Sequence, residues 1–285
     1  MNNIKLLPLL IFVLHCTSNP FWDDPSTDGL YLSGTILTEN NSIDTPVSVW
    51  LETFESYTTT DQDGNFSIEI SNTQSTLGSI SGPMKIYFFI YNYQLDSAII
   101  NLTNGRISNT QTDFSINGVL VKTIELKKIM SGSLALEPFE GKFYDRDSVQ
   151  IVFNVEIYNS VNIDLYKYGT NHTYNVHSGL IFHDIENDTA IFYRYSGYDA
   201  YGNLMDDRLI HLNYEMNENI QWKYVVKTNQ INLVAGEYQI IPYFIINHDF
   251  IPLELINAMD GDSFSFSNNY LNIPIDIVTT SLLVE

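Results

Sequence analysis

Residues 149–157 read VQIVFNVEI, and this stretch decides the fold class. Apolar side chains stand at every second position: Val149, Ile151, Phe153, Val155 and Ile157. Side chains of a β-strand point alternately to the two faces of a sheet, so a period of two predicts a strand that buries one face. An amphipathic helix would instead repeat its apolar residues every three to four positions.

The composition of the whole chain favours the same structure. The 285 residues include 19 Tyr and 16 Phe, alongside many Ile, Val and Thr, and these residue types suit a pleated, half-buried surface. Asn, Ser and Asp interrupt the chain at intervals of roughly 8–12 residues, which is typical of an all-β sandwich. We therefore predict an all-β protein with two β-sandwiches in series, after a cleaved signal peptide.

The domain boundaries follow from changes in this pattern. Residues 130–147 contain Gly, Ser and Pro without clear alternation, which indicates a linker. Residues 233–243 resemble the Leu-x-x-Gly-x-Tyr turn and strand found late in many immunoglobulin-like domains. The predicted order is a signal peptide (1–15), a tether (16–28), a first sandwich (29–129), the linker (130–147) and an immunoglobulin-like sandwich (148–285).

The first predicted sandwich contains a recognisable turn. Residues 59–68 read TTDQDGNFSI, where Asp61–Gly64 predicts a hairpin and Gly64 supplies the positive φ that the turn needs. With GTI at 34–36 and TPVSV at 45–49, this order resembles the carboxypeptidase regulatory-like family over roughly residues 30–127. The resemblance implies a transthyretin-like β-sandwich that acts as an adhesive or scaffolding module, without peptidase activity.

The N-terminus carries an export signal. Residues 6–14 are nine apolar residues after a start with one positive charge. This run is too short to span a bilayer, which takes roughly 20 residues, but it suits a secretory signal. Val13-Leu14-His15-Cys16 resembles the lipobox of bacterial lipoproteins, which implies that Cys16 is acylated and becomes the first mature residue.

A second cleavage site competes with the lipobox. Cys16-Thr17-Ser18 is also a small-x-small site, and a cut after Ser18 would discard the only cysteine of the chain. Both sites predict export. The first predicts a protein anchored by lipid in the cell envelope, at the outer membrane, and the second a secreted or periplasmic protein.

The charge limits the partners. The chain contains 34 Asp and Glu but only 13 Lys and Arg, which gives a net charge of −21. Nucleic acid is not an expected partner, because binding it needs a basic surface. Anionic lipid head groups would repel such a chain, so we expect membrane attachment only through the N-terminal lipid.

One stretch, residues 193–203, is a candidate ligand-binding site. Four tyrosines with Asp and Asn indicate a sugar-stacking platform or an adhesive loop, since tyrosine makes rigid amphipathic contacts. The alternative is that Tyr193 and Tyr195 form one face of a strand that leads into a Gly-rich turn. The candidate ligand-binding residues are Tyr193, Tyr195, Tyr198 and Tyr201.

No metal site or cofactor is predicted. The spacing at Asp61 fails the calcium loop of an EF-hand, which needs Gly at position six and Glu at position twelve. His172, His177 and His183 are close in sequence, but a six-residue strand step separates the last two by about 20 Å. The acidic residues Asp206-Asp207 and those at 260–262 are interpreted as turn residues, with calcium bound at the sandwich loop ends as the alternative.

The sequence lacks the motifs of common enzymes. We find no Gly-x-Ser-x-Gly, no His-Glu-x-x-His and no phosphate-binding Gly-rich loop. We expect a non-catalytic envelope protein that binds a protein or a glycan at the cell surface. The alternatives are a carbohydrate-binding component of a polysaccharide uptake system and a hydrolase with an unrecognised carboxylate site.

Overall fold

The computed structural model describes residues 30–39, 45–70, 80–168, 176–198, 204–248, 251–259 and 264–285. The described chain is all-β, and its helical parts are α1 (Leu253–Ala258) and short 3-10 turns. No helix among these residues is long and apolar enough to cross a membrane. The predicted signal peptide, Cys16 and the tether lie outside the described residues.

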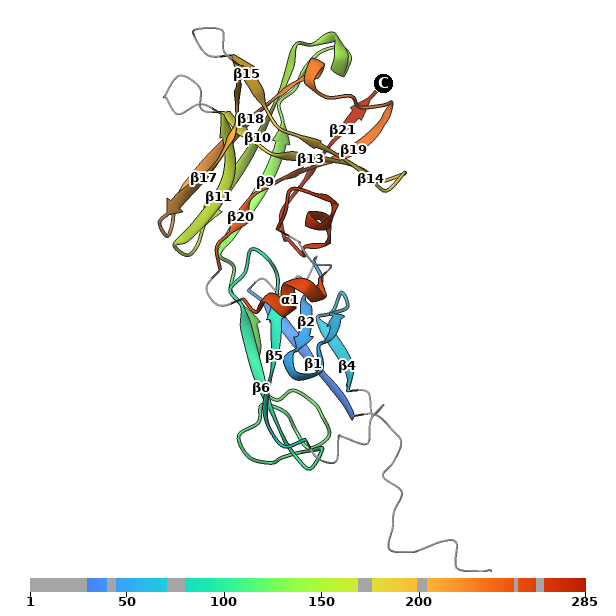
Figure 1. Ribbon diagram of the computed structural model, residues 1–285, viewed down its shortest axis with the longest axis vertical. Coiled ribbons are helices and arrows are strands. Elements are labelled where there is room, and N and C mark those ends of the chain that lie inside the picture. The colour runs from blue at the N-terminus through green and yellow to red at the C-terminus, as the bar shows by residue number, and fades with distance from the viewer. Residues whose placement is uncertain are drawn as a thin grey trace, which may run out of the picture.

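Two sheets form the first sandwich, at one end of the molecule (Figure 1). Apolar side chains such as Leu32, Phe66 and Phe88 fill the core between them. The three-stranded sheet has the order β4 (Asn65–Ile70), β1 (Leu30–Thr38) and β8 (Ile124–Leu126). The five-stranded sheet has the order β3 (Ser56–Thr59), β2 (Ser48–Leu51), β5 (Gly82–Phe89), β6 (Asp96–Thr103) and β7 (Arg106–Ile107).

Strand β1 runs along the length of the first sandwich. It pairs antiparallel with β4 and parallel with β8, where Ile36 lies opposite Ile124 and Thr38 opposite Leu126. Nine residues of extended chain measure about 30 Å. Strand β8 leads directly into the second sandwich, and β1 runs parallel to β8. Strand β1 therefore begins, at Leu30, at the end of the first sandwich that points away from the second (Figure 1).

The predicted turn at Asp61–Gly64 is present, but its two strands do not form a hairpin ladder. Gly64 has φ 78°, and the Asp61 carboxylate accepts hydrogen bonds from the backbone N–H of Asp63 and Asn65. These hydrogen bonds lower the pKa of Asp61. Strand β3 pairs with β2 and strand β4 with β1, so the turn carries the chain from one sheet to the other.

The second sandwich packs a seven-stranded sheet on a four-stranded sheet. Phe153, Trp222, Phe182 and Ile240 contribute to the core between them. The larger sheet has the order β17 (Arg208–Tyr214), β11 (Val161–Tyr168), β12 (Val176–Ser178), β18 (Asn219–Lys227), β10 (Ser148–Ile157) and β9 (Met130–Leu136), with β20 (Ile245–Ile246) on β11. The smaller sheet has the order β14 (Thr189–Tyr193), β13 (Leu180–Asp184), β19 (Gly236–Pro242) and β21 (Thr280–Val284), and β15 (Ser196–Tyr198) pairs with β16 (Leu204–Asp206).

The prediction of an all-β chain with two sandwiches in series is confirmed, but the predicted linker needs correction. Its first residues form β9, which pairs antiparallel with β10 from Met130 to Leu136. Gly132 lies there because a Cβ at this position would overlap the buried ring of Phe153. The glycine and serines of β9 thus belong to a packed strand, and the second sandwich begins at residue 130.

The two sandwiches meet in a packed junction. Strand β2 is buried on both faces: Val49 and Leu51 belong to the first core, while Trp50 belongs to the core of the second sandwich. Figure 1 shows helix α1 lying against the first sandwich beside β2, and the hydroxyl of Ser48 contacts the sulfur of Met259 just after this helix. The outer face of β2 is therefore covered by the C-terminal part of the chain.

Three consecutive residues after β5 hold the junction: Tyr91, Asn92 and Tyr93. The Tyr91 hydroxyl accepts the N–H of Ile246 at 2.9 Å, and its ring stacks on Phe264 with 5.2 Å between centroids. Burial raises the pKa of Tyr91 well above its usual value, so the phenol stays protonated and can donate to the carbonyl of Phe244.

Asn92 is fully buried and joins three segments of the chain. Its Nδ2 donates to the carbonyl oxygens of Met130 (2.9 Å) and Asp276 (2.8 Å), and its Oδ1 accepts the N–H of Asp276 (2.9 Å). Lys128 forms an ion pair with Asp276 at 2.8 Å beside this amide. These contacts bind the two sandwiches into one elongated body (Figure 1).

Candidate functional site

The tyrosines predicted to bind a ligand serve the fold where they are described. Tyr193 is 2% exposed, and its hydroxyl accepts the N–H of Lys227 and donates to the carbonyl of Val225. Burial raises its pKa. A side chain so enclosed cannot be a contact platform, so the ligand-binding prediction is corrected for Tyr193: it is one face of a strand.

Tyr195 is half-buried and surrounded by other side chains. Its ring lies 4.7 Å from the ring of Tyr168, and the Lys227 ammonium lies 4.7 Å over its face. Its backbone N–H donates to the Ser178 hydroxyl. The side chain of Tyr198 and the whole of Tyr201 lie outside the described residues, so the predicted four-tyrosine platform stays a prediction there.

Among the described residues, the acidic and histidine residues considered for metal binding do not form a common site. Asp207 is buried and its Oδ1 accepts from Arg194, while Asp206 and residues 260–262 have no described side chains. His183 contacts Asp188 in the β13–β14 turn, His177 lies in the core of the second sandwich, and His172 lies outside the described residues. Within the described ranges, no three His, Cys, Asp or Glu side chains could hold a metal ion.

His177 makes the stability of the second sandwich depend on pH. Its ring stacks on Trp222 with 5.9 Å between centroids, and its Nδ1 accepts the N–H of Lys223. Burial, and secondly the charge of Lys167, lower the pKa of His177 to about 4. In the unfolded chain a histidine titrates near pH 6.5, so between these values the unfolded state binds more protons and stability falls as the pH falls.

We expect the free energy of unfolding to drop by about 3 kcal/mol more in the wild type than in His177→Gln between pH 6.5 and pH 4, since one pKa unit corresponds to ~1.4 kcal/mol. Glutamine keeps an acceptor for the N–H of Lys223 but does not titrate. Urea denaturation across this pH range measures the difference. Parallel curves for the two proteins would contradict the assignment.

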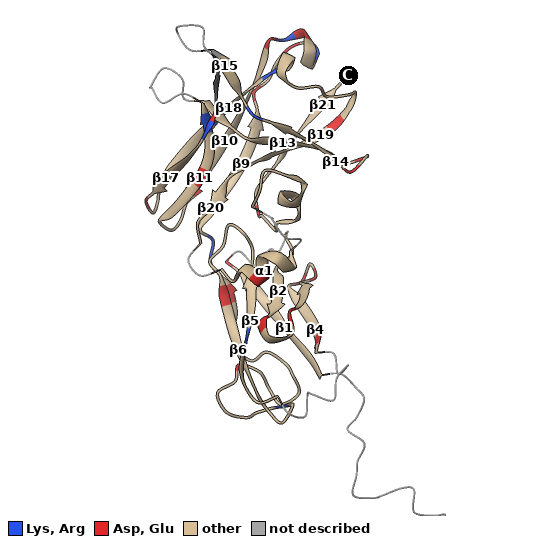
Figure 2. Ribbon diagram, in the orientation of Figure 1, with Lys and Arg blue, Asp and Glu red and all other residues tan. Residues whose placement is uncertain are grey.

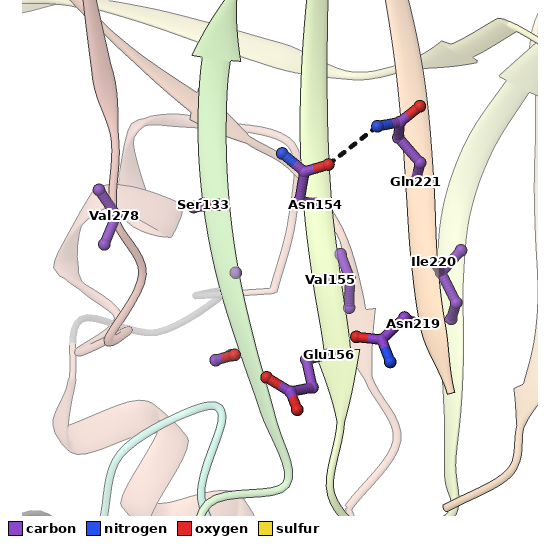
Figure 3. A pocket seen from close by; sticks show the side chains of 10 residues that line it. Ser133, Asn154, Val155, Glu156, Asn219, Ile220, Gln221 and Val278 are labelled. Carbon is purple, nitrogen blue, oxygen red and sulfur yellow. Dashed lines mark hydrogen bonds between the residues drawn. The ribbon is translucent and has the colours of Figure 1, made fainter. Parts of the chain in front are cut away.

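The outer surface of strands β9, β10 and β18 carries a hollow of about 500 Å³, which is lined by polar side chains and also by Val155, Ile220 and Val278 (Figure 3). Along each strand most apolar residues face the core and most residues between them face outward, although the apolar Val152 takes an outward position of β10 and is buried. We call this surface the polar face and define it by six outward side chains: Ser131, Ser133, Asn154, Glu156, Asn219 and Gln221.

Strand register arranges the polar face as two rows of three. Asn154 of the central strand β10 lies opposite Ser133 of β9 and Gln221 of β18. Glu156 lies opposite Ser131 and Asn219 in the same way. Neighbouring strands are about 4.8 Å apart and residues two apart on a strand about 7 Å, so the six groups form a regular grid.

Hydrogen bonds within the polar face leave many donors and acceptors open. Gln221 Nε2 donates to Asn154 Oδ1 at 2.9 Å (Figure 3). Among the described residues, Asn154 Nδ2, Gln221 Oε1 and the amide of Asn219 have no hydrogen-bond partner. The grid therefore presents both donors and acceptors to solvent.

Tyr158 and Val278 border the polar face. The Tyr158 hydroxyl donates to Glu156 at 2.9 Å and lies 3.2 Å from the Ser131 hydroxyl, and 37% of this side chain is exposed. Val278 forms an isolated parallel β-bridge with Ser133 of β9, and its side chain is 65% exposed. The grid thus has an oriented aromatic ring near one end and an apolar group at one side.

A second hollow, of about 730 Å³, lies near the junction. It lies between Gln94 and Leu95 of the first sandwich and strands β11 and β17 of the second. Some of its polar groups are used within the protein: Asn159 donates to the carbonyl of Lys128, Ser160 to Glu215, and His248 contacts the carbonyl of Tyr91. The polar face differs in that its side chains stand on three strands paired in register, and we take it as the candidate site.

No family model and no curated protein matches the chain. Among solved structures, BcpA, the major pilin subunit of Bacillus cereus, is similar at 9% identity and a TM-score of 0.23, over 74% of this chain and 86% of that one. The Bacillus anthracis TIE protein is similar at 11% identity and a TM-score of 0.22, over 78% of this chain and 47% of that one. Likenesses this weak say nothing about what the chain binds, and the fold rests on its own strand pairings.

Sequence reasoning missed the polar face, although part of the signal was visible. The stretch 149–157 contains Asn154 and Glu156 between its apolar residues, and residues 219–223 repeat the pattern with Asn219 and Gln221. Amides at outward strand positions are the ordinary pattern of a sheet with one solvated face, so they do not mark a binding surface by themselves. Their alignment into rows requires the strand register.

Proposed function

We propose that this chain is a non-catalytic protein of the cell envelope, anchored by a lipid at Cys16, which displays its two sandwiches for binding or scaffolding. In this proposal the first sandwich is a carboxypeptidase regulatory-like, transthyretin-like module, and residues 16–28 tether it to the outer membrane. The partner would be a protein or a glycan at the cell surface. The apolar run at 6–14 followed by Cys16 supports the anchor.

The packed junction is the observation that carries this proposal. Leu30, where the described chain begins, lies at the end of the first sandwich opposite the junction. The contacts of Tyr91 and Asn92 fix the second sandwich beyond it. With an N-terminal anchor, the second sandwich and its polar face would therefore lie beyond the first sandwich, on the side away from the tether.

Intact-mass measurement of the wild type and of Cys16→Ser, in membrane and soluble fractions, tests the anchor. We expect the wild type to begin at Cys16, to carry added acyl mass and to fractionate with membranes. The serine variant should lack the acyl mass, because the acylated atom is the cysteine sulfur. A mature start at Asn19 without lipid would contradict the anchor and leave a secreted or periplasmic binder.

The polar face favours a second candidate, a carbohydrate-binding component of a polysaccharide uptake system. Its groups are hydroxyls, amides and one carboxylate, which are the groups that hydrogen-bond to sugar hydroxyls. The hydrolase alternative has less support there. Glycoside hydrolysis usually takes a pair of carboxyl groups, and Glu156 is the one ionisable side chain that lines the described hollow.

A further inference from the structure

We propose that the polar face of β9, β10 and β18 binds a neutral oligosaccharide. This inference rests on the proposed function, because it names the ligand class of a displayed binding surface. It places the sugar site not at the predicted tyrosines of residues 193–201 but in the hollow on the outer surface of β9, β10 and β18, where amides and hydroxyls face solvent.

The chemistry of the grid selects for hydroxyl groups. A sugar hydroxyl both donates and accepts, so it needs partners of both kinds within a short distance. Asn154 Nδ2 and the amide of Asn219 offer donors, while Gln221 Oε1 and the Glu156 carboxylate offer acceptors. Both kinds alternate along the two rows that the strand register creates.

Size and rigidity fit the same ligand. A hollow of about 500 Å³ lies within the range of small-molecule sites, ~300–1,000 Å³. The side chains stand on three paired strands, and Asn154 and Gln221 hold each other in place. A ligand thus meets groups that are already ordered, which reduces the entropy lost on binding.

The borders of the grid suit the apolar faces of sugar rings. The Tyr158 hydroxyl is tied to Glu156 and lies beside Ser131, so its ring is fixed with more than a third of its surface open. Val278 presents methyl groups beside Ser133. A pyranose ring has C–H groups that can pack on such surfaces while its hydroxyls reach the amides.

The charges at the hollow disfavour anionic ligands and calcium. The hollow is lined by no lysine or arginine, and the basic residues drawn in Figure 2 are few and scattered along the two sandwiches. A phosphate or an acidic sugar in the hollow would meet the Glu156 carboxylate and a chain of net charge −21, and the nearest outward lysine on these strands, Lys223, lies at the next outward position beyond Gln221 on the same face of β18. One carboxylate is also a poor site for calcium, which takes six to eight oxygen ligands.

The test is binding of the whole chain, in detergent, to an array of neutral gluco-, manno-, galacto- and xylo-oligosaccharides, with and without EDTA. We expect retention of at least one of these series with or without EDTA. Asn154→Ala and Gln221→Ala should each weaken it at least tenfold, because each removes one partner of the hydrogen-bonded amide pair in the row Ser133–Asn154–Gln221. Both side chains are exposed, so these variants should fold.

Gln150→Ala is the matched control, since Gln150 also faces outward on β10 but does not line the hollow. Its binding should stay within twofold of the wild type. The inference is overturned if no neutral glycan binds, if binding survives Asn154→Ala and Gln221→Ala, or if EDTA abolishes it. Acylation of Cys16 is measured separately by intact mass. A failure of glycan binding would therefore leave the lipid-anchor proposal in place, and an absence of acylation would leave the glycan-binding proposal in place.

Discussion

Replacing Asn92 by aspartate should lower the free energy of unfolding by about 3–5 kcal/mol at neutral pH. The change is nearly isosteric, but it turns the donor that serves the carbonyls of Met130 and Asp276 into an oxygen. The new carboxylate would be buried against two carbonyl oxygens and near Asp276. Urea denaturation followed by the fluorescence of Trp50 and Trp222 measures this loss.

Protonation should return part of the stability of Asn92→Asp. A neutral carboxyl group can donate one hydrogen bond to one of the two carbonyls, so the gap to the wild type should narrow in acid. Asn232→Ala is the control, because Asn232 is an exposed asparagine. Its effect should stay within about 0.5 kcal/mol. An Asn92→Asp protein that unfolds at the wild-type urea concentration would show that the junction does not depend on this amide.

Gly132→Ala should cost about 3 kcal/mol, although it adds only one methyl group to a β-strand. The new Cβ would overlap the Phe153 ring at Cζ and Cε2. That ring is fully buried against Trp222 and Phe244, with centroids 5.4 and 5.9 Å away, so it has no free space to move into. Thermal and urea unfolding of the variant measure the loss.

A double variant separates this overlap from any effect on strand propensity. Phe153→Leu removes the ring atoms that the new methyl group would meet, so the double variant should be more stable than the sum of the single effects by about 1–2 kcal/mol. Gly236→Ala is the control, because a Cβ there would have its nearest neighbour at 3.8 Å. Additive effects would show that the Phe153 ring is not the obstacle.

Gly132 also explains why β9 could not be predicted from the sequence. Strand β10 was predictable because five apolar residues stand at every second position, and this pattern alone indicates a strand with one buried face. In β9 the inward position between Met130 and Leu134 is Gly132, so its alternation is hidden and the segment resembles a linker. The reason for the glycine is Phe153, which only the pairing of the two strands brings near.

For the candidate site residues, too, the sequence predicted the position on a strand but not the contacts. The buried position of Tyr193 follows from its place on β14, and the strand alternative raised for it at the outset was correct. Asn154 and Gln221 are 67 residues apart, and their hydrogen bond depends on the register of β10 against β18. The alternation along β10 and β18 predicts that Asn154 and Gln221 face outward. It does not predict which side chains of neighbouring strands they meet.

The parallel pairing of β1 with β8 has a mechanical consequence. A tensile load between an N-terminal anchor and a ligand on the second sandwich would enter at Leu30 and leave through Leu126. Since both strands run in the same direction, this load would slide them past each other and strain their hydrogen bonds together. If the proposed anchor and ligand are both present, the three residue pairs from Ile36–Ile124 to Thr38–Leu126 would therefore bear such a load together and not one after another.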